Sequence, residues 1–127
     1  MGSRSVILVL AFVVFLAACG PAKEPQVQVV EDYLGALVEK NGDEISILSC
    51  AEWELNALLE LDSLQAVDTR LEDLSCSVSG DDNGTTLVTC QGKLIATYND
   101  EDQDLDLSVR TYQVIQQGGN WLVCGYR

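Results

Sequence analysis

Two kinds of hydrophobic spacing divide the chain after residue 26. From Val27 to Val38, apolar residues recur every three or four positions with acidic residues opposite them, a spacing typical of an amphipathic helix. Asn41-Gly42 predicts the end of this helix. The spacing further predicts a short helix capped by Asp43 and a third helix opened by a capping box at Ser49–Glu52. We expect three helices: 27–40, 43–48 and 52–63, the last burying Trp53, Leu55, Leu58 and Leu59.

Beyond residue 66 the spacing changes to alternation. Leu74, Cys76 and Val78 share one face of a first strand, and Asn83-Gly84 is a strong hairpin signal. Short polar segments separate the later strands, as in an antiparallel meander. The predicted strands are 67–79, 85–99, 105–116 and 121–126. The chain is thus expected to be an α+β domain, with N-terminal helices packed on one face of a curved four-stranded antiparallel meander.

The first 26 residues follow another pattern. Arg4 precedes an uninterrupted apolar run from Val6 to Ala18, which is too short for a stable transmembrane helix and fits a signal peptide. Leu16-Ala17-Ala18-Cys19 resembles the lipobox of bacterial lipoproteins. The resemblance implies cleavage between Ala18 and Cys19 and lipidation of Cys19. The alternative is an ordinary secretory signal cut after Ala18. We expect a signal peptide (1–18), a lipidated cysteine with a tether (19–26) and one domain (27–127).

Charge narrows the range of partners. The signal contains Arg4 as its only charged residue, so the mature chain has 7 − 1 = 6 basic against 20 acidic residues, a formal charge of −14. This balance disfavours nucleic acid and close contact with anionic lipid. We expect no nucleic-acid partner, and contact with the membrane through the lipid on Cys19. The domain is expected outside the cytoplasm, on the periplasmic side or the outer cell surface.

Cysteine spacing predicts two disulfides. Cys50, Cys76, Cys90 and Cys124 remain in the exported domain, an even number in an oxidising compartment. A hairpin symmetric about residue 83 places Cys76 opposite Cys90, which leaves Cys50 to pair with Cys124. Unpaired, buried cysteines are the alternative. Zinc is disfavoured because the chain has no histidine and no Cys-x-x-Cys.

The order of elements resembles the cystatin-like/NTF2-like superfamily of small bacterial lipoproteins. The likeness rests on the opening Val-Glu-Asp-Tyr-Leu-Gly-Ala-Leu segment with its Lys40–Asp43 break. It rests also on the closing Tyr-Gln-Val-Ile-Gln-Gln-Gly-Gly-Asn-Trp-Leu-Val-Cys hairpin. It implies a curved sheet over helices that sometimes encloses a pocket. It implies no single activity, because the superfamily includes enzymes, binding proteins and dimerisation modules.

Candidate chemistry is sparse. Without histidine there is no imidazole base, so catalysis would depend on carboxylates, tyrosines or lysine. Tyr33, Tyr98 and Tyr112 are the candidates to line a pocket of the kind the resemblance implies. Acids at 100, 102 and 104 match the start of a calcium loop, but Leu105 and Thr111 stand where glycine and glutamate are required. We therefore expect no metal site and no cofactor.

These observations favour a lipid-anchored, non-catalytic binding domain of the cell envelope. Its expected ligand is a protein partner or a small apolar molecule held between the sheet and the helices. One alternative is an enzyme that uses tyrosine and Asp/Glu within a cone-shaped pocket. Another is a structural module that dimerises through the open sheet face.

Overall fold

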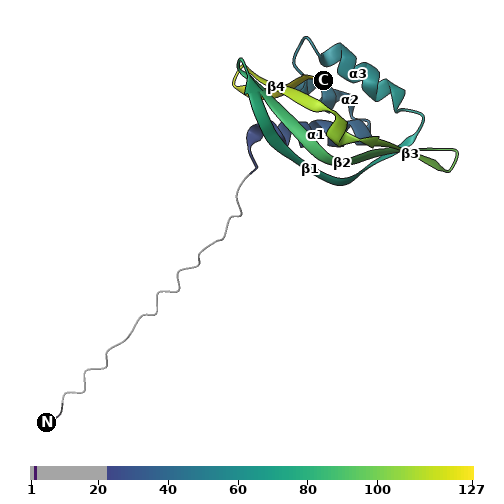
Figure 1. The fold of residues 1–127 in the computed structure, drawn as a ribbon, viewed down its shortest axis with the longest axis horizontal. Helices are drawn as coiled ribbons and strands as arrows, with labels where there is room; N and C mark the ends of the chain where they lie inside the picture. The colour runs from purple at the N-terminus through teal and green to yellow at the C-terminus, as the bar shows by residue number, and fades with distance from the viewer. Residues whose placement is uncertain (1, 3–22) are drawn as a thin grey trace.

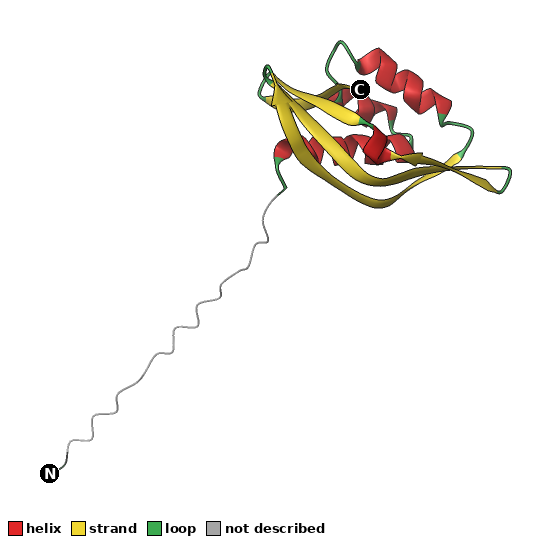
Figure 2. Cartoon of the chain, in the orientation of Figure 1, coloured by secondary structure: helices red, strands yellow, loops and turns green. Residues whose placement is uncertain are grey.

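In the computed structural model, three helices are followed by an antiparallel sheet, and the description covers residues 23–127 and Gly2. The elements in chain order are α1 (Pro25–Glu39), α2 (Gly42–Leu48), α3 (Glu54–Ser63), β1 (Asp68–Asp82), β2 (Thr85–Tyr98), β3 (Glu101–Asp106), the 3-10 helix η1 (Leu107–Val109), β4 (Thr111–Gln117) and β5 (Asn120–Tyr126). Figure 1 shows the long β1–β2 hairpin curving along α1. The helices and the sheet form two layers (Figure 2). The predicted α+β class is confirmed.

The sheet has five strands, so the prediction of four is wrong. The strand order is β1-β2-β4-β5, and β3 pairs with the C-terminal half of β2. The predicted third strand, 105–116, is interrupted by η1, where Leu107 turns into the core and is fully buried. Asp106 caps this turn through its side chain, which accepts a hydrogen bond from the Ser108 amide. Strands β3 and β4 therefore follow one another along the same edge of β2.

The helix boundaries differ from the expected ones by a few residues. Helix α1 begins at Pro25, which has no amide hydrogen to leave unpaired in a first turn. Lys40 adopts the left-handed conformation that ends it, and Asn41, instead of Asp43, caps α2 by accepting from the Glu44 amide. No capping box forms before α3, because the Ser49 hydroxyl donates to the Ile45 carbonyl.

Helix α3 faces the core with a different side from the one predicted. Ala57 and Leu61 are buried, whereas Leu55 and Leu59 are 69% and 58% exposed. The Trp53 indole fixes this orientation, since its Nε1 donates to the Tyr33 hydroxyl over 3.1 Å. The burial of Leu55 and Leu59 was thus wrongly predicted.

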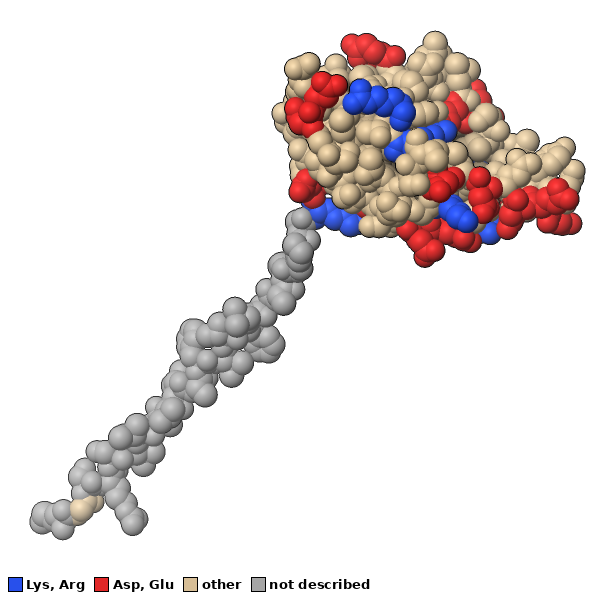
Figure 3. Space-filling view, in the orientation of Figure 1, with Lys and Arg blue, Asp and Glu red and all other residues tan. Residues whose placement is uncertain are grey.

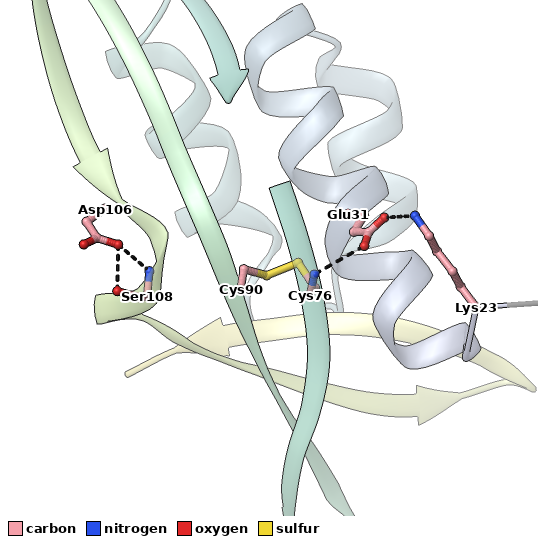
Figure 4. Close-up of a disulfide and its surroundings, with 6 residues drawn as sticks. All are labelled: Lys23, Glu31, Cys76, Cys90, Asp106 and Ser108. Carbon is pink, nitrogen blue, oxygen red and sulfur yellow. Dashed lines mark hydrogen bonds and ion pairs between the residues drawn. A yellow bond between two sulfur atoms is a disulfide. The ribbon is translucent and has the colours of Figure 1, made fainter. Parts of the chain in front are cut away.

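Both predicted disulfides are present. Cys76 lies opposite Cys90 in the β1–β2 register and is bonded to it (Figure 4). Cys50 is bonded to Cys124 across 74 residues. The tight turn pairs Asp82 with Thr85, but an extra residue, Ser79, shifts the register by one before the cysteines are reached. The two bonds indicate an oxidising, extracytoplasmic compartment.

A second bulge bends the long hairpin. Asp73 and Leu74 on β1 together oppose Gly92 on β2. A Cβ at Gly92 would lie 2.5 Å from the Glu72 carbonyl oxygen, and its φ is +103°. Glycine is therefore required here for the two backbones to approach, and the bend lets the sheet curve along α1.

Candidate functional site

The space between sheet and helices is filled. Tyr33 from α1 and Tyr112 from β4 meet edge to face with ring centroids 6.4 Å apart, and neither has any exposed surface. A side chain without accessible surface borders no water-sized cavity, so these two tyrosines line no pocket. The space on which the cone-pocket enzyme depends is occupied by the core around them.

Tyr98, the third predicted pocket residue, lies elsewhere. It ends β2 beside the β2–β3 turn and is 58% exposed. It borders a shallow polar hollow of about 400 Å³ together with Asp68 and Asp100. Its inclusion among residues lining an internal pocket was wrong, because strand β2 extends past the end of the helices.

One polar pair lies at the edge of the filled interior. The Arg110 guanidinium donates from Nη1 to Glu60 Oε1 over 2.7 Å and also lies 3.9 Å from the centre of the Tyr126 ring. Burial alone would lower the pKa of Arg110, but the hydrogen bond and charge of Glu60 raise it. This pair ties α3 to the start of β4. It was not predicted, since nothing in the local sequence connects residues 50 apart.

Burial also changes the pKa of the two interior tyrosines, Tyr33 and Tyr112. It raises the pKa of Tyr33 well above the ordinary value, and it raises that of Tyr112 as well. The Tyr112 hydroxyl lies near Arg110 without forming a hydrogen bond of ordinary geometry. Both hydroxyls are thus neutral at physiological pH, and neither is a candidate base.

The acidic segment after Tyr98 is a strand and its turn. Asp102 is hydrogen-bonded by Arg70 and Thr97, and Asp104 pairs with Lys93 across the strand. These carboxylates are committed to neighbouring strands and do not converge on one point. Figure 3 shows acidic side chains gathered along the lower edge and the right-hand end of the domain.

A surface groove lies between helices α1 and α2 and strand β5. We call it the α1–α2 groove: Pro25, Gln28, Val29 and Asp32 line it from α1, Ile47 and Leu48 from α2, and residues 119–122 from the β4–β5 turn and β5. Its volume is about 460 Å³. Figure 1 shows that α1 begins at the same end of the domain as the turn between β4 and β5.

Ile47 is a strongly exposed apolar side chain on the wall of this groove. In the short helix α2, Ile45 points into the core and is fully buried, so Ile47, two positions on, must point outward. It is 73% exposed. The sequence carries this signal, because two isoleucines at this spacing cannot both face the core, but the prediction did not use it.

The groove is held in shape by backbone bonds and a disulfide. Ser49 and Val123 form a parallel bridge, and the Cys50 amide donates to the Val123 carbonyl over 2.9 Å. The Cys50–Cys124 bond lies beside this bridge. The end of α2 and strand β5, two walls of the groove, are therefore fixed relative to each other.

Among the described residues, Cys50, Glu52 and Cys124 come close enough together to suggest metal ligands. The two sulfurs, however, are bonded to each other. A disulfide sulfur carries no thiolate charge for a metal ion, so this group has no complete ligand set.

Two predicted features fall outside the residues that the structure describes. The signal segment with its cleavage point at Ala18 and the lipid-bearing Cys19 both lie there. Among the described helices, none combines the length and the apolar character that crossing a bilayer requires.

Comparison with known proteins identifies a fold only. No protein-family model matches the chain, and no curated protein is similar to it in sequence. A SEC-C motif-containing protein from Rhodopseudomonas palustris, solved in solution, aligns with a TM-score of 0.52 at 12% identity, over 78% of this chain and 74% of its own. A designed NTF2-like protein aligns with a TM-score of 0.48 at 13% identity, over 79% of this chain and 92% of its own. The first likeness shows that a protein from Rhodopseudomonas palustris has a similar arrangement of helices and antiparallel sheet.

Proposed function

We propose that the mature protein is a lipid-anchored, extracytoplasmic domain that binds an apolar group in the α1–α2 groove. The exposed Ile47 on the wall of a preformed groove carries the proposal. An isoleucine that is 73% exposed beside Val29 and Leu48 offers apolar surface that a ligand can cover. Helices on one face of a bent antiparallel sheet also support the cystatin-like/NTF2-like assignment of the domain.

Anchoring is the second part of the proposal. The lipobox-like segment ending at Cys19 supports lipidation, and the two disulfides support export. Acyl chains on Cys19 would hold the domain at a membrane without a spanning helix. Because α1 begins at the end of the domain opposite the acidic β2–β3 turn, the anchor would direct the acidic end away from the bilayer (Figures 1 and 3).

Binding of a ligand is favoured over dimerisation through the sheet. The outward positions of β1 and β2 include Arg70, Ser75, Ser77, Gln91 and Lys93, all polar and exposed. A stable interface between copies needs an apolar centre. The groove offers apolar surface, and this sheet face offers little.

The neutral dye Nile red tests the groove, using mature protein whose ester-linked acyl chains have been removed by a lipase. Ile47→Asp is expected to weaken dye binding at least fivefold, because it replaces an apolar side chain of the groove wall with a charged one. Leu55→Asp is the matched control, since Leu55 is 69% exposed on α3 and lies outside the groove. Equal dye affinity for Ile47→Asp and the unsubstituted protein would contradict the proposed site.

A further inference from the structure

We propose that the α1–α2 groove shelters one of the acyl chains on Cys19 of the same molecule when the protein is away from a bilayer. This inference rests on the lipidation proposed above and names the groove's occupant. Three observations carry it: the reach of the tether, the charge of the groove and the rigidity of its walls.

The lipid attachment point lies within reach of the groove. Pro25 is both the first residue of α1 and part of the groove wall. Lys23, two residues earlier, forms an ion pair with Glu31 on α1 (Figure 4). The tether from Cys19 to Lys23 is therefore four peptide steps, a reach of at most about 14 Å. An acyl chain attached this close to the groove is present there at a high effective concentration.

The charge of the groove selects an uncharged occupant. Asp32 is the sole ionisable residue among those that line the groove as described. A free fatty acid or an anionic phospholipid would place its own negative charge beside this carboxylate, in a domain that is already strongly acidic. The ester-linked chains of a lipidated cysteine carry no such charge. The covalent lipid of this chain therefore fits better than a free anionic one.

The walls of the groove suit a flexible chain. Val29 and Ile47 supply aliphatic surface and Trp121 a broad aromatic one, whereas Gln28 and Asn120 supply polar groups. The Cys50–Cys124 bond keeps α2 against β5, so little ordering of the protein has to accompany uptake. The acyl chain is flexible and can adapt to the shape of the groove.

A bilayer would compete with the groove. A membrane buries every methylene of an acyl chain, whereas this groove is open to solvent along one side and buries part of it. We therefore expect the acyl chain to lie in the membrane when a membrane is present and in the groove when no membrane is present. The groove would lower the exposure of the lipid while the protein is in transit.

The two tryptophan indole N–H signals in a ¹H–¹⁵N spectrum test this inference. Trp121 lines the groove, whereas Trp53 donates its indole hydrogen to Tyr33 in the interior and is the internal control. The lipidated protein is measured in detergent-free buffer before and after a lipase removes its ester-linked chains. We expect the Trp121 signal to shift on deacylation by at least 0.1 ppm in ¹H and the Trp53 signal to stay in place.

Substitutions and mass determination separate the outcomes. In Ile47→Asp the Trp121 signal should no longer respond to deacylation, whereas in Leu55→Asp it should respond as in the unsubstituted protein. Two outcomes would overturn the sheltering inference and leave the anchoring proposal intact. The first is a Trp121 signal that does not shift although mass determination shows the protein to be acylated. The second is association of the acylated protein into micelle-like particles. A mass that shows no lipid would instead overturn the anchoring proposal.

Discussion

Arg110 and Glu60 form an ion pair 2.7 Å long between the start of β4 and helix α3, with only 17% and 16% of their side chains exposed. The two opposite charges meet in a place that water reaches poorly, with Glu60 Oε1 accepting from Arg110 and Glu60 Oε2 buried without a hydrogen bond. This contact ties helix α3 to the sheet, and the Trp53–Tyr33 hydrogen bond ties the start of α3 to α1. The pair therefore helps to keep the space between helices and sheet closed.

Glu60→Ala is predicted to lower the free energy of unfolding by about 2–3 kcal/mol, because it leaves the partly buried Arg110 charge without its carboxylate. Asp104→Ala provides the control: its pair with Lys93 is 44% and 51% exposed and should contribute less than ~1 kcal/mol. Urea denaturation measures both. Equal losses for the two variants would show that α3 does not depend on the buried pair.

The interior tyrosines predict a loss of stability at high pH. Their pKa values are raised by burial, so the folded state keeps its hydroxyl protons where the unfolded chain releases them. Their contribution is complete below the ordinary tyrosine pKa of about 10 and declines as the pH rises toward the folded-state values. Tyr112→Phe should make this decline shallower. Thermal unfolding between pH 8 and 11.5 measures the slope, and an unchanged slope would contradict the assignment.

At neutral pH the same two tyrosines should respond differently to loss of the hydroxyl. Tyr33→Phe removes the acceptor of the Trp53 indole hydrogen, at a cost of about 1–2 kcal/mol. Tyr112→Phe removes a buried hydroxyl without a hydrogen bond of ordinary geometry and should be within about 0.5 kcal/mol of the parent. A larger loss for Tyr112→Phe than for Tyr33→Phe in urea denaturation would reverse this account.

Gly92→Ala is predicted to destabilise the fold by at least about 2 kcal/mol. A methyl group there would meet the Glu72 carbonyl oxygen at 2.5 Å, and the backbone is left-handed. Gly84→Ala is the matched control, because Gly84 also has a positive φ but has nothing within 4 Å of the added atom. It should cost about 1 kcal/mol. If both substitutions have the same effect on the denaturation midpoint, close approach is not the reason for glycine at position 92.

The two disulfides are predicted to contribute unequally to the free energy of unfolding. Cys50–Cys124 spans 74 residues and Cys76–Cys90 spans 14. In the chain-entropy account, the longer loop contributes about 4 kcal/mol and the shorter about 3 kcal/mol. The double variants Cys50→Ala/Cys124→Ala and Cys76→Ala/Cys90→Ala, compared by urea denaturation, test the order. A smaller loss of stability on removal of Cys50–Cys124 than on removal of Cys76–Cys90 would indicate that loop length does not govern the contribution of a disulfide.

Local pattern predicted the fold class, three helices and the disulfide partners, because each depends on spacing along the chain. The pairing of Cys76 with Cys90 was right for a partly wrong reason. The two-residue turn is symmetric about a point between residues 83 and 84, and the bulge at Ser79 restores the symmetry about residue 83 that the prediction assumed. The bulge itself depends on how the hairpin fits the rest of the sheet.

Features that depend on distant contacts were not predictable in this way. The break at Leu107 arises because that side chain enters the core, and the exposure of Leu55 follows from an α3 orientation set by Trp53 and Tyr33. Tyr98 looked like a pocket residue by type, but its strand extends past the helices. The groove could have been suspected from Ile45 and Ile47, yet its other walls come from β5 and the start of α1, which only the folded chain brings together.

The attachment of lipid to Cys19 is the central claim, because the anchor, the orientation of the domain and the occupant of the groove all depend on it. Mass spectrometry of the N-terminal peptide of the protein from the membrane fraction tests it most directly. The account predicts a peptide that begins at Cys19 and carries a diacylglyceryl group. An N-terminus elsewhere, or a peptide that begins at an unmodified Cys19, would contradict it.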